Sequence, residues 1–145
     1  MDLEEKLAAR GRELAAREAT QADALTRARV LADALHHRVS RALAAYEHAI
    51  SSAPWLSVVQ GGVQQDDKHL HAFEFDVRRG RHRVIVVVKS RGDVTLVGPF
   101  HMGKDEGPCR RVGFKPDDAV DAPTDDMIEA LGEVLDRFLV EAAAP

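Results

Sequence analysis

The sequence contains one cysteine, Cys109, and its aromatic residues make up only 5% of 145 residues. A single cysteine excludes an internal disulfide framework and any zinc site built on several thiolates. The longest apolar run in the strand-like region, Val84 to Val88, is far shorter than the roughly 20 residues that a membrane-spanning helix needs. The segment Met1 to Lys6 is acidic where a secretion signal is basic and then apolar. These features predict a cytoplasmic protein that does not insert into a membrane.

Charge is distributed unevenly along the chain, although the net charge is only −4. Residues 1–50 are neutral overall, residues 51–115 carry a net charge of +4, and residues 116–145 carry a net charge of −8. This asymmetry is typical either of a nucleic-acid surface or of an acidic segment that lies near a basic one. The sequence also has no asparagine, five lysines and fifteen arginines, a bias typical of a GC-rich bacterial genome.

Residues 1–52 predict a helical arm that serves as an oligomerisation segment. Alanine, leucine, arginine and glutamate dominate it, and no proline precedes Pro54. From Leu25 onward, apolar and small residues recur at alternating spacings of three and four, which is typical of a coiled coil. We therefore predict a homodimer with an interface formed by Leu25, Ala28, Ala32, Leu35, Val39, Ala42 and Tyr46.

The length of this helix raises a separate question. A helix from about Leu3 to about Ile50 would be roughly 70 Å long, whereas a body built from the remaining residues would measure only about 30–35 Å across. The overhanging part needs a partner helix, unless the chain breaks between Gly11 and Gln21 and folds back on itself. Leu7 and Leu14 continue the apolar spacing into the overhang, but Gly11, Glu18 and Gln21 interrupt it there. Both a straight and a broken helix are compatible with the sequence.

Residues 53–145 predict a compact domain that consists of an antiparallel sheet and a closing helix. Apolar alternation predicts strands at 69–77, 82–89 and 94–100, with shorter ones near 55–60 and 110–114. Thr124 is a good N-cap, and an apolar stripe follows it with helical spacing. The predicted fold class is α+β: a long N-terminal helix, a meander of four to five strands, and a C-terminal amphipathic helix packed on the sheet.

The alternation also predicts how the strands pair. If Arg79 and Gly80 form a two-residue hairpin loop, Val77 pairs with His82 and Asp76 lies opposite Arg83. The next strand keeps its apolar residues on the same face only if an odd-length loop or a bulge intervenes. Residues 84–88 are apolar on both faces, which predicts a central strand covered on both sides.

Two groups of residues are candidates for metal or thiol chemistry. His69 and His71 lie two apart on a predicted strand and point to one side, so together with His101 they are candidate metal ligands. The glycine- and proline-rich stretch from residue 98 to residue 111 is the most unusual segment of the chain. Its candidate ligand-loop residues are Lys104, Cys109, Arg110 and Arg111. These groups indicate, as an alternative, a small metal- or thiol-dependent enzyme or a ligand-binding protein.

A second alternative is a nucleic-acid-binding module that uses the arginine-rich hairpin, with Arg78, Arg79, Arg81, Arg83 and Arg91. The sequence pI of about 6.0, and the placement of these arginines at opposite ends of a shared strand, argue against it. The favoured interpretation is a non-enzymatic protein–protein interaction module, similar to an adaptor or chaperone. We expect its partners to be a second copy and another protein, and we expect neither a cofactor nor a catalytic residue.

Overall fold

The computed structural model describes residues 2–66, 71–103, 111–114 and 122–143. In chain order, its elements are α1 (Leu3–Ala49), a 3₁₀ turn η1 (Pro54–Leu56), β1 (Val59–Gln60), β2 (Gln64–Gln65), β3 (Ala72–Arg79), β4 (His82–Lys89), β5 (Val94–His101), β6 (Arg111–Phe114) and α2 (Asp125–Ala143). This order confirms the predicted α+β class with its long first helix, antiparallel sheet and closing helix.

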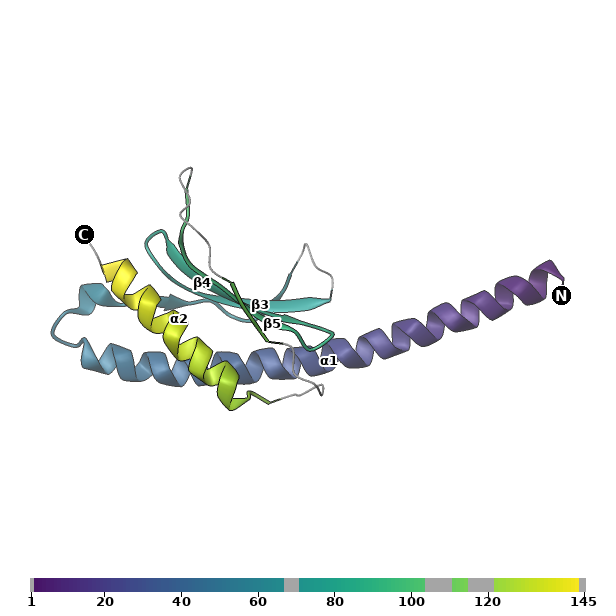
Figure 1. Cartoon of the computed structure of the whole chain (residues 1–145), viewed down its shortest axis with the longest axis horizontal. Helices are drawn as coiled ribbons and strands as arrows, with labels where there is room; N and C mark the ends of the chain where they lie inside the picture. The colour runs from purple at the N-terminus through teal and green to yellow at the C-terminus, as the bar shows by residue number, and fades with distance from the viewer. Residues whose placement is uncertain (1, 67–70, 104–110, 115–121, 144–145) are drawn as a thin grey trace.

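Helix α1 is unbroken over 47 residues. Asp2 caps its first turn, because the Asp2 carboxylate accepts a hydrogen bond from the amide of Glu5 at 2.8 Å. The break considered between Gly11 and Gln21 does not occur. Figure 1 shows the consequence: the N-terminal half of α1 projects far beyond the sheet and α2, while its C-terminal half lies against the sheet.

The strands form one antiparallel sheet in the order β1-β3-β4-β5-β6, and β2 also pairs with β3. The β3–β4 turn consists of Gly80 and Arg81, one residue later than expected, so that Val77 pairs with Val84 rather than with His82. Gly80 supplies the positive φ of +58° that the turn requires. Arg79 stays in the strand. The faces of the two strands are as predicted, but their partners are shifted by two residues.

Two further sequence expectations concern β4. Asp76 lies opposite Ile85, yet it still forms the expected ion pair with Arg83, diagonally, at 2.8 Å. At the turn, Val88 pairs with Val94 and the Lys89 amide donates to the Asp93 carbonyl at 2.8 Å, so residues 90–92 form the expected odd-length loop. A separate register shift between β4 and β5 lies at Arg83, at the other end of the strands. Gly98 accommodates the shift with a φ of +114°, and a Cβ atom there would lie 2.8 Å from the Arg83 carbonyl oxygen.

The core lies between one face of the sheet and both helices. Helix α1 contacts β3 and β4, and α2 contacts β4 and β5. The largest fully buried side chains are Phe75, Phe138, Leu31, Leu35, Leu96 and Met127. On the opposite face, Ile85 and Val87 are half-buried and neither helix packs there. The described chain therefore covers β4 on one side only, which corrects the expectation of two covered sides: apolar composition shows that a strand is central but not that a second layer exists.

Helix α2 begins as the sequence predicts. The hydroxyl of Thr124 accepts a hydrogen bond from the amide of Met127 at 3.2 Å, and the carbonyl of Thr124 accepts one from Ile128 at 3.1 Å. The apolar stripe of α2 packs into the core. Among the helices of the described residues, none is both long and apolar enough to cross a membrane.

Candidate interaction surface

The most conspicuous surface of the molecule is the projecting part of α1, residues 3–24, which we call the arm. The first buried residue of α1 is Ala28, and nearly every residue of the arm is exposed. Leu3, Leu7 and Leu14 are 66%, 60% and 48% exposed. These exposed large apolar side chains on one helix are candidates for an interaction surface.

The three leucines lie on one side of the arm. At 100° per residue, Leu3, Leu7 and Leu14 fall within an arc of about 40°. Ala32 and Val39, which pack on the sheet, fall within the same arc. The same side of α1 therefore carries apolar residues in both halves, with the polar Gln21 between them. The sheet covers its C-terminal half, and its N-terminal leucines are exposed in the described structure.

The residues predicted to form the oligomer interface lie mostly in this covered half. Four of the seven (Ala28, Ala32, Leu35 and Val39) are buried in the core of their own chain, and Leu25 packs against that core. Ala42 is exposed, and the hydroxyl of Tyr46 donates a hydrogen bond to the Leu56 carbonyl at 2.7 Å. The seam predicted for a partner helix is thus occupied by the chain's own sheet. A face of small and apolar residues suits packing on a sheet as well as on a helix.

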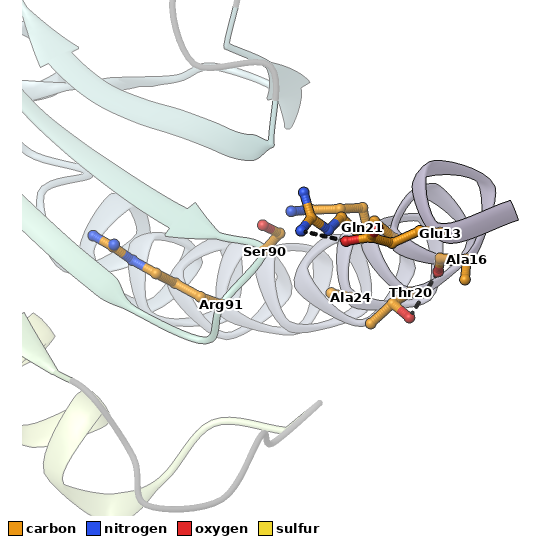
Figure 2. Close-up of a pocket in the computed structure, with 8 residues that line it drawn as sticks. Glu13, Ala16, Thr20, Gln21, Ala24, Ser90 and Arg91 are labelled. Atoms are coloured by element: carbon orange, nitrogen blue, oxygen red, sulfur yellow. Dashed lines mark hydrogen bonds and ion pairs between the residues drawn. The ribbon is translucent and has the colours of Figure 1, made fainter. Parts of the chain in front are cut away.

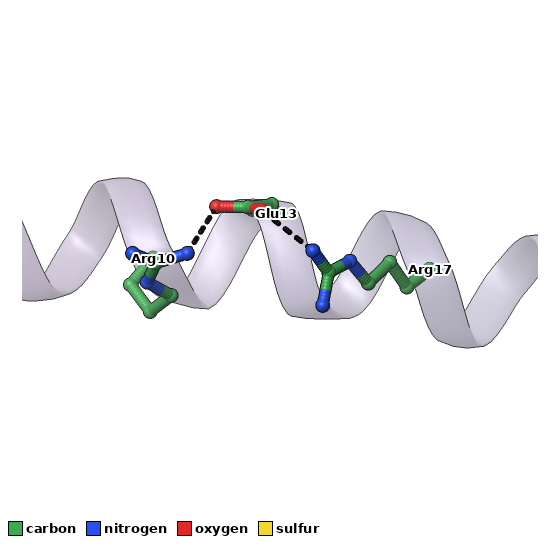
Figure 3. A network of polar contacts seen from close by, with 3 residues as sticks. All are labelled: Arg10, Glu13 and Arg17. Atoms are coloured by element: carbon green, nitrogen blue, oxygen red, sulfur yellow. Dashed lines mark hydrogen bonds and ion pairs between the residues drawn. The ribbon is translucent and has the colours of Figure 1, made fainter.

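The arm is held helical by local interactions. Glu13 joins two arginines across successive turns, with its carboxylate 2.7 Å from Arg10 Nη1 and 3.0 Å from Arg17 Nη2 (Figure 3). Each such exposed pair contributes only about 0.3–0.5 kcal/mol. The packed half of α1 removes the cost of helix nucleation, so the arm is an extension of an existing helix. Its own stability is nevertheless small, and a partner would add to it.

A groove of about 550 Å³ lies where the arm meets the body, and we call it the elbow groove. It is lined by Glu13, Ala16, Arg17, Thr20, Gln21, Ala24, Ser90 and Arg91. Ser90 and Arg91 belong to the β4–β5 turn, which approaches α1 at this point (Figure 2). Arg91 also forms an ion pair with Asp93 within the turn.

Polar contacts fix the rotation of α1 about its own axis. A ring nitrogen of His36 lies 3.0 Å from the Gly61 carbonyl oxygen, and the ring packs edge-on against Phe75 with centroids 5.1 Å apart. The hydroxyl of Ser40 donates to the Gln60 side chain at 2.6 Å, and the Gln60 amide donates back to the His36 carbonyl at 3.0 Å. These contacts hold the leucine side of the arm in a defined direction relative to the sheet.

The structure separates the candidate metal ligands. His69 lies outside the described residues. His71 precedes β3 at the end of the sheet where Ala72 pairs with Lys89, whereas His101 pairs with His82 at the opposite end. The two ends are about 23 Å apart at 3.3 Å per strand residue. His71 and His101 therefore cannot share an ion, and no group of three potential metal ligands occurs among the described residues.

The other candidate ligand residues do not come together in the described structure. Lys104, Cys109 and Arg110 lie outside the described residues. Arg111 is the first residue of β6 and is exposed. His101 instead packs edge-on against His82, with ring centroids 5.0 Å apart. This contact joins two neighbouring strands and forms no pocket with the other candidates.

The arginines of the hairpins are largely used within the chain. Arg79 donates to the Ala142 carbonyl at the end of α2, and its Nη2 lies 3.1 Å from the Trp55 carbonyl oxygen. A guanidinium at a helix C-terminus also interacts favourably with the helix dipole. Arg83 and Arg91 form ion pairs with neighbouring aspartates. Three of the five arginines are thus engaged, which weakens the case for a nucleic-acid surface.

Sequence reasoning did not identify the elbow groove, because the helix and the turn that line it are remote from each other in the chain. The exposed leucines could be predicted in part, because Leu7 and Leu14 continue the heptad spacing. Nothing in the sequence shows that the more regular half of α1 is the half that packs on the sheet. Comparison with protein-family models, with curated proteins and with solved structures found no match.

Proposed function

We propose that this protein is a non-enzymatic protein–protein interaction module that self-associates through its arm. The observation that carries this proposal is a projecting helix with Leu3, Leu7 and Leu14 exposed on one side. The same side of the same helix already serves as a packing surface further along, at Ala32 and Val39. A second helix would bury the free part in the way that the sheet buries the rest.

The energetics favour a dimer of moderate affinity. Burying one exposed leucine contributes about 1.5–3 kcal/mol when burial is complete. Six partly exposed leucines, three from each chain, would contribute on the order of 5–10 kcal/mol. Association costs about 4–15 kcal/mol in lost translational and rotational freedom. The gain from the leucines is thus similar in size to the cost of association, and the dimer should dissociate on dilution.

The test is the mass of the full-length chain measured by light scattering during size-exclusion chromatography over a series of concentrations. One chain has a mass of 15.9 kDa. We expect a mass approaching twice this value at high concentration and a fall toward the mass of one chain on dilution. The variant Leu3→Gln/Leu7→Gln/Leu14→Gln should remain a monomer throughout, because glutamine keeps helix propensity and removes the apolar side.

Val30 provides a matched control. It is 47% exposed on the same helix, but it lies on the side opposite the leucines at 100° per residue. Val30→Gln should therefore dimerise as the natural chain does. A natural chain that keeps the mass of a single chain at every concentration would refute self-association.

A further inference from the structure

We propose that two arms pair antiparallel over residues 3–25, about a two-fold axis near Leu14, so that the start of each α1 lies in the elbow of the other chain. This inference rests on the proposed function and specifies the partner and geometry of the same surface. It draws on three observations: which side of α1 the sheet occupies, where charges lie along the arm, and the position of the elbow groove.

Steric exclusion rules out a parallel pair. The leucine side of the arm is continuous with the side of α1 that carries the sheet, from Ala28 to Leu43. In a parallel pair the second helix would continue along that side and collide with the sheet. In an antiparallel pair, Leu3 of one helix lies beside the body of the other chain, and the helix runs from there away from that body. The two bodies therefore lie at opposite ends of the paired arms. The free apolar side ends near Leu25, which sets the length of the overlap.

The apolar side chains match in this arrangement. With the axis at Leu14, the two Leu14 side chains lie level with each other, and Leu3 of each chain lies level with Leu25 of the other. Leu7 lies level with Gln21, whose aliphatic stem covers it. Leu3, Leu7, Leu14, Gln21 and Leu25 all fall within an arc of about 40° on α1. The seam is therefore straight enough for two helices to follow.

The charges favour the same direction. Asp2, Glu4 and Glu5 place three carboxylates at the start of α1. A parallel pair would bring six of them together, whereas an antiparallel pair brings each trio to the elbow of the other chain. Arg27 is exposed on α1 near that elbow. The antiparallel pair therefore keeps the two acidic helix starts apart.

The elbow groove borders the seam where the second helix begins. Gln21 and Ala24 belong to the wall of the groove, and Ser90 and Arg91 line it from the β4–β5 turn. The first turn of the second helix would fill this space with its polar flank. The groove would then be closed by three segments: two arms and one turn.

Disulfide cross-linking of the full-length chain tests the direction of pairing. Cys109 is replaced by serine in every variant, and Leu7→Cys, Gln21→Cys and Leu14→Cys are made singly, one of them with a size tag. In a glutathione redox buffer, we expect tagged Leu7→Cys to cross-link to Gln21→Cys at least tenfold more than either cross-links to itself. Leu14→Cys should cross-link to itself, because it lies near the axis.

The controls separate this inference from the proposed function. Arg12 lies on the side of α1 opposite the leucines, so Arg12→Cys should cross-link with none of the variants. Self-cross-linking of Leu7→Cys and of Gln21→Cys, without the mixed product, would overturn the antiparallel geometry while leaving self-association intact. A dimeric mass with no cross-link from Leu14→Cys would overturn the seam itself. A monomeric mass for the natural chain would instead refute the proposed function.

Discussion

At the residue scale, the tightest constraint in the described structure falls on Gly61, between β1 and β2. Its amide donates a hydrogen bond to the carbonyl oxygen of Asp76 at 2.9 Å. A Cβ atom at this position would lie 2.1 Å from Asp76 Oδ1. Asp76 cannot move away freely, since it is 7% exposed and its carboxylate is held by Arg83. Glycine is required here because the Asp76 carboxylate leaves no space for a side chain, and not because of the backbone conformation.

We predict that Gly61→Ala lowers the free energy of unfolding by about 1–3 kcal/mol, the usual effect of inserting a group into occupied space. Gly62→Ala is the matched control, because a Cβ there meets no atom within 4 Å. Its effect should stay within about 0.5 kcal/mol. Urea unfolding followed by circular dichroism measures both. Equal losses in the two variants would show that the clash with Asp76 is relieved by movement of the loop.

At the element scale, α1 shows what a heptad pattern does and does not determine. The composition predicts a helix from about Leu3 to about Ile50, and the helix is observed from Leu3 to Ala49. The spacing of three and four adds an apolar side from Leu25 onward. It also identifies Ala28 and Leu35 as buried. It cannot identify what buries them, because a sheet and a second helix both select small and apolar residues. The free half, with Leu7 and Leu14, is the less regular part of the pattern, so the sequence alone could not distinguish it as the half that is open to a partner.

For the strands, too, the sequence predicted some features and not others. Alternation gave the face of each strand in the β3–β4 hairpin, because side chains alternate strictly along a strand. The register depended on which residues form the turn, and Gly80 together with the tertiary contacts of Arg79 decided it. The elbow groove requires the β4–β5 turn to meet α1, a contact between segments remote in sequence. No local pattern encodes that contact.

Helix α2 offers a prediction about backbone conformation. Gly132 lies in the middle of α2 beside a small groove of about 100 Å³ against α1, and a Cβ there meets no atom within 4 Å. Gly132→Ala should raise the free energy of unfolding by about 0.5–1 kcal/mol, because alanine loses less backbone entropy in a helix. Urea unfolding measures the change.

Gly80 is the control for that substitution. A Cβ at Gly80 also meets no atom within 4 Å, but its φ is +58°. Gly80→Ala should therefore lower the free energy of unfolding by about 1–2 kcal/mol. The pair separates backbone preference from available space. Destabilisation by Gly132→Ala would mean that α1 and α2 approach more closely than the structure shows.

At the scale of the whole molecule, the chain combines a packed body with a weakly stabilised extension. The C-terminal half of α1 shares one core with the sheet and α2. Among the described residues, the ion pairs of the arm are local ones such as those of Glu13. Protection of backbone amides from exchange depends on local and global opening free energies. The two halves of one helix should therefore differ in protection.

We predict that amides of residues 5–24 exchange faster than those of residues 31–43 in dilute protein, and that their protection rises at least tenfold at concentrations where the dimer forms. Hydrogen–deuterium exchange with mass spectrometry measures both. The variant Leu3→Gln/Leu7→Gln/Leu14→Gln should show no rise. Concentration-independent protection of the arm in a chain that does dimerise would place the interface elsewhere.

The continuity of α1 has a consequence for how such a chain can vary. Each residue inserted between arm and body would lengthen the helix by about 1.5 Å and turn the leucine side by about 100° about the helix axis. Seven inserted residues would bring it back to within about 20°, with the helix about 10 Å longer. In the proposed dimer, the spacing of the two bodies and their mutual orientation would thus both be set by one number, the count of residues in the helix.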